Sequence, residues 1–326
     1  MNVLAITIAD PETGSTKYRV HQYRDLLAEN GMSLATVRRH APREEFLARV
    51  AEADVVLNQK CLLGSRRGRC IWRRTNRVLF DFDDAIYTRP GRPRSLPTRL
   101  RVYLRMRYWL RRSMVVVAAN EYLATYARRF ARRVEVIPMG LDLDAWSPAA
   151  EKLAGRVVVG WAGAPVNLPR IESLGPALQR VVRRHPNVEF RVYSGGCPQL
   201  PFPFTHVPYA PGTEPEFVRQ LDIGLLPLTD EEHSRGKSPI KSIQYLACGV
   251  PVVGNVMGAT HEICTPDSTI AVGQGTAEWE SAICSLVEDP ERRRRLGAAG
   301  RQHVLPRFCA HANGALLLRL LREIGS

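Results

Sequence analysis

The residues best suited to chemistry in this chain lie between positions 236 and 263. Lys237 and Lys241 stand in a polar loop that leads into a short helix ending at Gly249, and the apolar run Val250–Val253 predicts a strand after it. The free N–H groups at the start of a helix carry partial positive charge that favours phosphate oxygens, and nearby lysines strengthen the attraction. The spacing therefore predicts a diphosphate site, although an ordinary αβ unit with solvated lysines fits the same spacing.

Two other loops carry glycines at the ends of predicted strands. Gly14, Ser15 and Thr16 follow the first strand, and Gly163 follows the first strand of the second half of the chain. Glycine lets a ligand approach the backbone closely, and a hydroxyl can cap a helix or bind a phosphate. Neither loop has the G-x-G-x-x-G or G-x-x-x-x-G-K-[ST] pattern, so nicotinamide-dependent and nucleoside-triphosphatase functions are not favoured.

Three carboxylates, Asp81, Asp83 and Asp84, cluster where an apolar strand ends. Carboxylates this close can bind Mg²⁺ or share one proton. The cluster superficially matches the first motif of haloacid-dehalogenase-type phosphatases, so a Mg²⁺-dependent phosphatase using Asp81 and Asp83 is one alternative function. Against it, that motif ordinarily opens its domain, and Ala85 replaces the usual Thr or Val. No two histidines have the spacing of metal ligands, and we expect no metal site.

The chemistry-bearing loops are separated by a regular alternation of strand-like and helical patterns. This alternation predicts parallel strands with crossover helices in a doubly wound α/β fold. A turn-rich tract near residues 139–155 interrupts it. We therefore expect two Rossmann-like domains facing each other across a cleft, at 1–147 and 148–305, with a C-terminal helix at 306–326 that packs back on the first. Ligands of such sheets lie at the carboxyl ends of the strands.

The composition is that of a soluble globular protein, with 45% hydrophobic and 24% charged residues. The apolar runs are too short to span a bilayer, and the N-terminus reads as a first strand instead of a signal peptide. Seven scattered cysteines without a C-x-x-C pair predict a reduced, cytoplasmic chain. The net charge of +14, from 46 Lys and Arg against 32 Asp and Glu, favours anionic partners.

Much of the positive charge lies in residues 89–112, where arginines alternate with leucine and tyrosine from Leu96 onward in a partly helical rhythm. Such a segment suits an interfacial helix on an anionic membrane surface. A solvated arginine face on a packed helix is an equally good interpretation. Nucleic acid is the least favoured partner, because no helix-turn-helix, RNP or zinc-finger pattern accompanies the charge.

Taken together, these motifs resemble the glycosyltransferases of the GT-B fold, in the group of family 4 enzymes. The resemblance extends from the first strand to the last helix. It is carried by the Gly14–Arg19 loop, Val78–Asp84, Val136–Trp146, Gly160–Gly163, Asp222–Leu228 and Lys237–Glu262.

The resemblance implies a nucleotide-diphosphate sugar as co-substrate, with no other cofactor and no metal. Lys237 and Lys241 would face the diphosphate, and Gln244 would contact the ribose or sugar. The loops that contain Gly14, Ser15, Arg19, Gly163 and Glu262 would complete the donor site. The acceptor would bind the first domain, near Asp83 and Asp84, and Lys237, Lys241, Asp83 and Asp84 would carry catalysis. Electrostatic stabilisation of the leaving diphosphate would be the main catalytic contribution.

The chain departs from the family pattern at three positions. Gly236 and Gln244 replace two glutamates, and Asp83 replaces a first-domain histidine. The expected function is sugar transfer, with retention, to a glycan, lipid-linked or small-molecule acceptor in polysaccharide biosynthesis, in the cytoplasm or peripherally at the inner membrane face. The missing glutamates leave a non-catalytic nucleotide-sugar-binding or scaffold protein of the same fold as the alternative.

Overall fold

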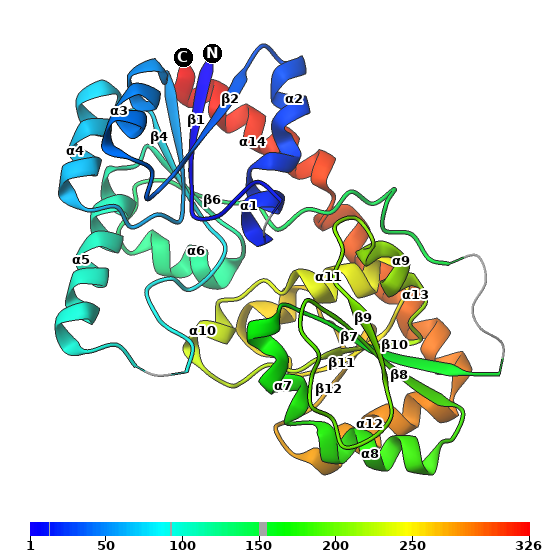
Figure 1. The fold of residues 1–326 in the computed structure, drawn as a ribbon. Coiled ribbons are helices and arrows are strands. Elements are labelled where there is room, and N and C mark those ends of the chain that lie inside the picture. The colour runs from blue at the N-terminus through cyan, green and yellow to red at the C-terminus, as the bar shows by residue number, and fades with distance from the viewer. Residues whose placement is uncertain (13, 92, 150–154) are drawn as a thin grey trace. The chain divides into compact units, whose positions relative to one another are not determined.

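The computed structural model describes residues 1–12, 14–91, 93–149 and 155–326. Thr13, Arg92 of the basic segment and residues 150–154 of the predicted interdomain tract lie outside the described residues. The chain divides into two compact units (Figure 1). Unit 1 comprises Met1–Gly140, Glu231–Ser238 and Ala310–Ser326, and unit 2 comprises Leu141–Asp230 and Pro239–Cys309.

Unit 1 is built on a six-stranded parallel sheet in the order β2-β1-β3-β4-β5-β6. Its strands are β1 (Asn2–Thr7), β2 (Ser33–Arg38), β3 (Val55–Gln59), β4 (Val78–Phe82), β5 (Val115–Ala118) and β6 (Val134–Val136). Its helices are α1 (Gly14–Arg19), α2 (Arg24–Glu29), α3 (Arg43–Glu52), α4 (Ser65–Arg74), α5 (Leu96–Arg112), α6 (Glu121–Arg128), α10 (Glu232–Arg235) and α14 (Ala310–Gly325), with a 3-10 turn at His21–Tyr23.

Unit 2 contains a second six-stranded parallel sheet, in the order β12-β11-β10-β7-β8-β9. Its strands are β7 (Val157–Ala162), β8 (Val188–Ser194), β9 (Thr205–Pro208), β10 (Ile223–Leu226), β11 (Val252–Gly254) and β12 (Thr269–Ala271). Its helices are α7 (Leu168–Glu172), α8 (Gly175–Arg184), α9 (Glu214–Arg219), α11 (Ile240–Ala247), α12 (Thr276–Glu288) and α13 (Pro290–Arg307), with 3-10 turns at Pro165–Asn167 and Gly258–Glu262.

Strands such as β1, β5 and β7 are largely apolar because both faces of each sheet are covered. In β1, Leu4 and Ile6 point into one core of unit 1, and Val3 and Ala5 point into another on the opposite face. The C-terminal helix α14, red in Figure 1, contributes leucines to the second core, with Leu321 fully buried. The predicted fold class, two doubly wound α/β sheets, is therefore confirmed.

The basic segment forms α5, which begins at Leu96 as predicted. Across the described parts of the chain, no helix combines the length and the apolar character needed to cross a bilayer. Parallel strands leave all their carboxyl ends at one edge of each sheet, and the segments that follow those ends, helical or not, carry the predicted site residues.

Candidate functional site

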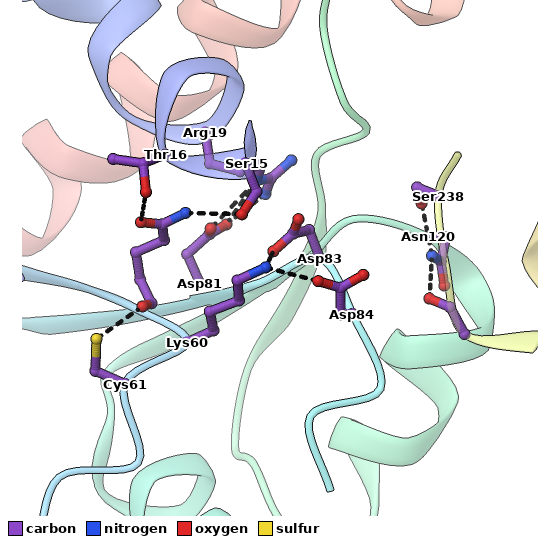
Figure 2. A network of polar contacts seen from close by, with 12 residues as sticks. Ser15, Thr16, Arg19, Lys60, Cys61, Asp81, Asp83, Asp84, Asn120 and Ser238 are labelled. Atoms are coloured by element: carbon purple, nitrogen blue, oxygen red, sulfur yellow. Dashed lines mark hydrogen bonds and ion pairs between the residues drawn. The ribbon is translucent and has the colours of Figure 1, made fainter. Parts of the chain in front are cut away.

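Polar side chains of unit 1 gather where β3 and β4 end (Figure 2). The two strands are parallel neighbours with Gln59 opposite Asp81, so the residues after them emerge at the same edge of the sheet. Lys60 directly follows β3, and Asp83 and Asp84 directly follow β4. The acidic cluster seen in the sequence is therefore assembled with cations from other elements.

Arg19, the last residue of α1, forms a buried ion pair with Asp81. Its Nε lies 3.2 Å from both carboxylate oxygens of Asp81, and its Nη2 donates to Oδ1. Its Nη1 donates to the carbonyl oxygens of Ile137, at 2.5 Å, and Pro138, at 3.0 Å. Arg19 and Asp81 are 4% and 3% exposed. The guanidinium is thus engaged within unit 1, and donor binding by Arg19 stays a prediction.

Lys60 joins the other two carboxylates of the cluster. Its Nζ lies 2.7 Å from Asp83 Oδ1 and 2.7 Å from Asp84 Oδ2. The Lys60 and Asp83 side chains are 6% and 7% exposed, whereas the Asp84 side chain is 26% exposed. One buried ammonium therefore holds two carboxylates, of which only Asp84 presents appreciable surface.

The two carboxyls have different pKa values because their surroundings differ. Burial raises the pKa of Asp83, with Lys60 opposing and Asp84 adding to the effect. Burial acts in the same direction on Asp84, but Lys60, followed by Lys237 and His233, outweighs it and lowers the pKa of Asp84. Neighbouring carboxyls whose pKa values are pushed apart can take different roles in acid–base chemistry. Asp84 is the one that keeps its charge to lower pH.

Asn120 connects this edge of the sheet to the segment 231–238. As the N-cap of α6, its Oδ1 accepts a hydrogen bond from the Leu123 amide at 2.9 Å. Its Nδ2 donates to the Gly236 carbonyl at 3.2 Å and to Ser238 Oγ at 2.8 Å. Asn120 is 2% exposed, so these bonds form away from water. A single buried amide thus holds the start of the predicted diphosphate loop within unit 1.

Gly236 lies so close to its neighbours that a side chain does not fit in this conformation. A Cβ there would stand 2.8 Å from Ala85 Cβ and 3.1 Å from Leu123 Cδ2. The glutamate that the family pattern places at this position is therefore excluded by packing. Lys237, the next residue, is near enough to Asp84 and His233 to affect the pKa values of both.

Gly14, Ser15 and Thr16, which the sequence predicted to lie in a loop, are the first residues of α1. Gly14 has a φ of +48°, and a Cβ built on it would meet no atom within 4 Å. Gln59 accepts a hydrogen bond from Thr16 Oγ1 at 3.0 Å, and its Nε2 donates to Ser15 Oγ at 3.3 Å. The start of α1 is therefore fixed to the end of β3, while Gly14 faces open space.

Lys241 lies in unit 2, in the first turn of α11. Its Nζ is 2.6 Å from Glu214 Oε1, and the two side chains are 21% and 20% exposed. The N-cap of α11 is Pro239, which has no side-chain acceptor for the first N–H groups of the helix. Unit 2 therefore places an ammonium beside a helix N-terminus, and a carboxylate fixes the position of that ammonium.

The other predicted donor residues of unit 2 are Gln244, Gly163 and Glu262, and they differ in exposure. Gln244 is fully buried in α11. Its contact with a ribose or sugar stays a prediction. Gly163 lies under Trp161, whose ring carbon Cζ2 would be 2.2 Å from a Cβ at that position. Glu262 ends a 3-10 turn, and its carboxylate is 4.0 Å from Arg307.

The acidic cluster does not have the arrangement of a metal site. In the described residues, no group of three or more His, Cys, Asp or Glu is placed to hold a metal ion. Asp81 is already paired with Arg19, and Asp83 with Lys60. These pairings argue against the phosphatase alternative, in which Asp81 and Asp83 would be available to Mg²⁺ and substrate.

Three residues of these sites were not among the predicted ones: Lys60, Asn120 and Glu214. Lys60 and Asn120 each lie just after the carboxyl end of a strand, β3 and β5. Because ligands of such sheets bind at these ends, this position in the sequence could have identified both residues as candidates. Glu214 is the first residue of α9. Its pairing with Lys241 could not be predicted from the local sequence, because Lys241 lies 27 positions away.

Comparison with known proteins gives a family match in the second half of the chain. Residues 175–318 match the family described as glycosyl transferase-like. A GDP-mannose-dependent monoacylated alpha-(1-6)-phosphatidylinositol monomannoside mannosyltransferase of Corynebacterium glutamicum is 26% identical over 215 residues, which are 58% of this chain and 56% of that protein. A D-inositol 3-phosphate glycosyltransferase of Segniliparus rotundus is 27% identical over 209 residues, 56% of this chain and 45% of the relative. The chain thus spans about half the length of these relatives.

Solved structures match over nearly the whole chain. A sucrose-phosphate synthase from Thermosynechococcus elongatus superposes with a TM-score of 0.77 at 18% identity, covering 99% of this chain and 98% of that one. HepE of Anabaena, in complex with UDP and glucose, gives 0.73 at 14% identity, covering 98% and 99%. At these identities the likeness concerns the fold, and it confirms the predicted GT-B architecture.

Proposed function

Because this chain belongs to the GT-B glycosyltransferases of the group 1, family 4-like type, we propose that it transfers a sugar from a nucleotide-diphosphate sugar to an acceptor. The observation that carries the proposal is Lys241 at the N-terminus of α11, paired with Glu214 in unit 2. An ammonium and unsatisfied helix N–H groups together suit a diphosphate, whose negative charge grows as the sugar leaves.

In this proposal Glu214 holds Lys241 in place until the donor arrives. The diphosphate then competes with Glu214 for the ammonium, and stronger pairing with the fully formed leaving group stabilises the transition state more than the bound donor. Protein cations supply the charge, so we propose transfer without a metal ion. Gly163, Gln244 and Glu262 remain the proposed donor contacts of unit 2.

Asp83 and Asp84 are proposed for the acceptor side, with retention of configuration as in the family that the chain resembles. Asp84 keeps its charge to lower pH and is the more exposed of the two. An ionised carboxylate can accept a hydrogen bond from an acceptor hydroxyl and orient it for attack.

A lipid-linked acceptor at an anionic membrane is the acceptor class that α5 supports best. The helix has no acidic residue, and Leu96, Leu100 and Leu104 are spaced along one face with exposures of 75%, 59% and 52%. Beside it, a groove of about 720 Å³ is lined by residues that include Leu96, Leu100, Arg94 and Arg99, together with Glu231 and Glu232. Apolar and cationic side chains on one surface suit an amphiphile with an anionic headgroup, and anionic lipids face the cytoplasm.

The proposal is tested by thermal shift with UDP-, GDP-, dTDP- and ADP-sugars, followed by transfer assays with the donor that stabilises the protein. Lys241→Ala is expected to lower the transfer rate on the order of a hundredfold, because it removes leaving-group stabilisation. The matched control is Arg180→Ala, which breaks an exposed ion pair with Glu280 in the same unit. Unchanged turnover in Lys241→Ala would contradict the assignment.

A non-catalytic nucleotide-sugar-binding protein is the second candidate, favoured by Gly236. Packing excludes a glutamate there, and Gln244 carries no charge at the other glutamate position. This alternative predicts that a donor stabilises the protein while no sugar is released or transferred with any acceptor supplied, lipid-linked acceptors included.

A further inference from the structure

Lys60 occupies a backbone conformation that lysine rarely adopts. Its φ is +43°, the only positive φ among the non-glycine residues that the structure describes. The left-handed region is sterically unfavourable for an L-residue other than glycine. The Lys60 amide donates to the Asp81 carbonyl oxygen at 2.6 Å, so the unusual backbone is fixed to the neighbouring strand. Such conformations persist where the surroundings determine them, and they gather at functional sites.

The strained backbone directs a buried ammonium to two carboxylates. Lys60 is 7% exposed, and its Nζ is 2.7 Å from oxygens of both Asp83 and Asp84. A buried ammonium is unfavourable unless it is paired, and removing Lys60 would leave two neighbouring carboxylates without their shared cation. The ion pairs with Lys60 therefore restrict where the two carboxylates lie.

We propose that Lys60 is a positioning residue for sugar transfer, which anchors Asp83 in the interior and aims Asp84 at the acceptor hydroxyl. The inference rests on the proposed function. It assigns different roles to Asp83 and Asp84, the two carboxylates proposed for the acceptor side. Asp84, with 26% of its side chain exposed, touches the acceptor, whereas Asp83, at 7%, acts through Lys60.

The charges that face this cluster come from several elements. Arg19 of α1 affects Asp83, and Lys237 and His233 of the 231–238 segment affect Asp84. Burial works to lower the pKa of Lys60, but Asp83 and Asp84 outweigh it and raise that pKa. Lys60 is thus charged at neutral pH, and it lowers the pKa of Asp84 more than Lys237 or His233 does.

The first experiment measures carboxyl titration in the free protein. Side-chain carboxyl ¹³C NMR follows Asp84 in the wild type, in Lys60→Met and in Lys60→Arg, with Asp84→Asn to assign the signal. Lys60→Met is expected to raise the pKa of Asp84 by about 1–3 units, because the shared cation is lost. Lys60→Arg keeps the charge and is expected to leave most of the shift in place. An Asp84 titration that is the same in Lys60→Met and wild type would overturn the proposal.

The second experiment separates positioning from donor binding and from folding. Asp84→Asn is expected to lower kcat on the order of a hundredfold. Lys60→Met is expected to move the acidic limb of the pH–rate profile to higher pH, with partial rescue in Lys60→Arg and with nucleotide affinity unchanged. Circular dichroism checks that each variant is folded, and if Lys60→Met does not fold, Lys60→Gln and Lys60→Arg give the same comparison.

An unshifted pH profile in a folded Lys60→Met or Lys60→Gln protein would refute the positioning role, as would an equal loss of nucleotide affinity. Failure of the proposed function looks different. In that case the wild type transfers no sugar from any donor, while the NMR titration still reports whether Lys60 controls Asp84.

Discussion

The ion pair of Arg19 with Asp81 allows a test of whether Arg19, which was predicted to bind the nucleotide-sugar donor, instead stabilises the fold. In Arg19→Met, the carboxylate of Asp81 stays 3% exposed and loses its partner, and the carbonyls of Ile137 and Pro138 lose a donor. Breaking a buried pair by removing one member typically costs about 3–5 kcal/mol. The free energy of unfolding should therefore fall by about that amount, measured as a lower urea midpoint with an unchanged slope.

A double-mutant cycle isolates the pair from the other contacts of Arg19. Arg19→Met combined with Asp81→Asn should cost less than the sum of the single variants, with a coupling of about 1–3 kcal/mol. The matched control is Arg128→Ala, whose pair with Glu121 has half-exposed side chains and should contribute less than about 1 kcal/mol. If Arg19→Met keeps its stability and loses nucleotide affinity instead, the structural interpretation is wrong and Arg19 belongs to the donor site.

Two further predictions concern packing and surface chemistry. Gly236→Ala introduces a Cβ at 2.8 Å from another carbon and should destabilise the protein by about 1–3 kcal/mol in thermal or urea unfolding, whereas Gly195→Ala, with 3.5 Å to its nearest neighbour, should be close to neutral. Equal stability of the two variants would show that segment 231–238 can shift to accommodate the added methyl group, contrary to the prediction. Leu100→Ser with Leu104→Ser should weaken sedimentation with anionic phospholipid vesicles at least tenfold, because each buried leucine contributes about 1.5–3 kcal/mol. Val166→Ser, at an apolar residue of unit 2 that is 83% exposed, should leave vesicle binding unchanged, and parallel losses would argue against docking through α5.

The fold was predictable because buried parallel strands are apolar on both faces. Runs such as Val115–Ala118 and Val157–Ala162 need no alternation to be recognised as strands. Helix α4 was harder to predict, because arginines dominate it and Gly68 interrupts its pattern. That glycine is explained by packing: a Cβ there would lie 3.3 Å from the ring of Tyr108. Such a constraint comes from another helix and leaves no local trace.

The residues of the candidate site that directly follow an apolar strand could be predicted from the sequence. The residues that belong to the site through ion pairs with distant parts of the sequence could not. Asp83 and Asp84 stand out as carboxylates after an apolar run. Lys60 does not, since its left-handed backbone is ordinarily signalled by glycine, and its partners lie more than twenty positions away. The chemistry of the site depends on this pairing, because Lys60 lowers the pKa of both carboxyls, and at Asp84 Lys237 and His233 add to it so that burial is outweighed.

The two lysines that the sequence placed in one loop belong to different units. Asn120 and the close packing of Gly236 hold segment 231–238 in unit 1, where Lys237 lowers the pKa of Asp84. Lys241, four residues later, is in unit 2 and pairs with Glu214. Since a side chain acts on the charges nearest to it, Lys237 is better placed to affect the carboxylate proposed for the acceptor, and Lys241 is better placed for its proposed contact with the diphosphate. The missing glutamate at 236 then follows from the docking of this segment, because only glycine allows it to lie against Ala85.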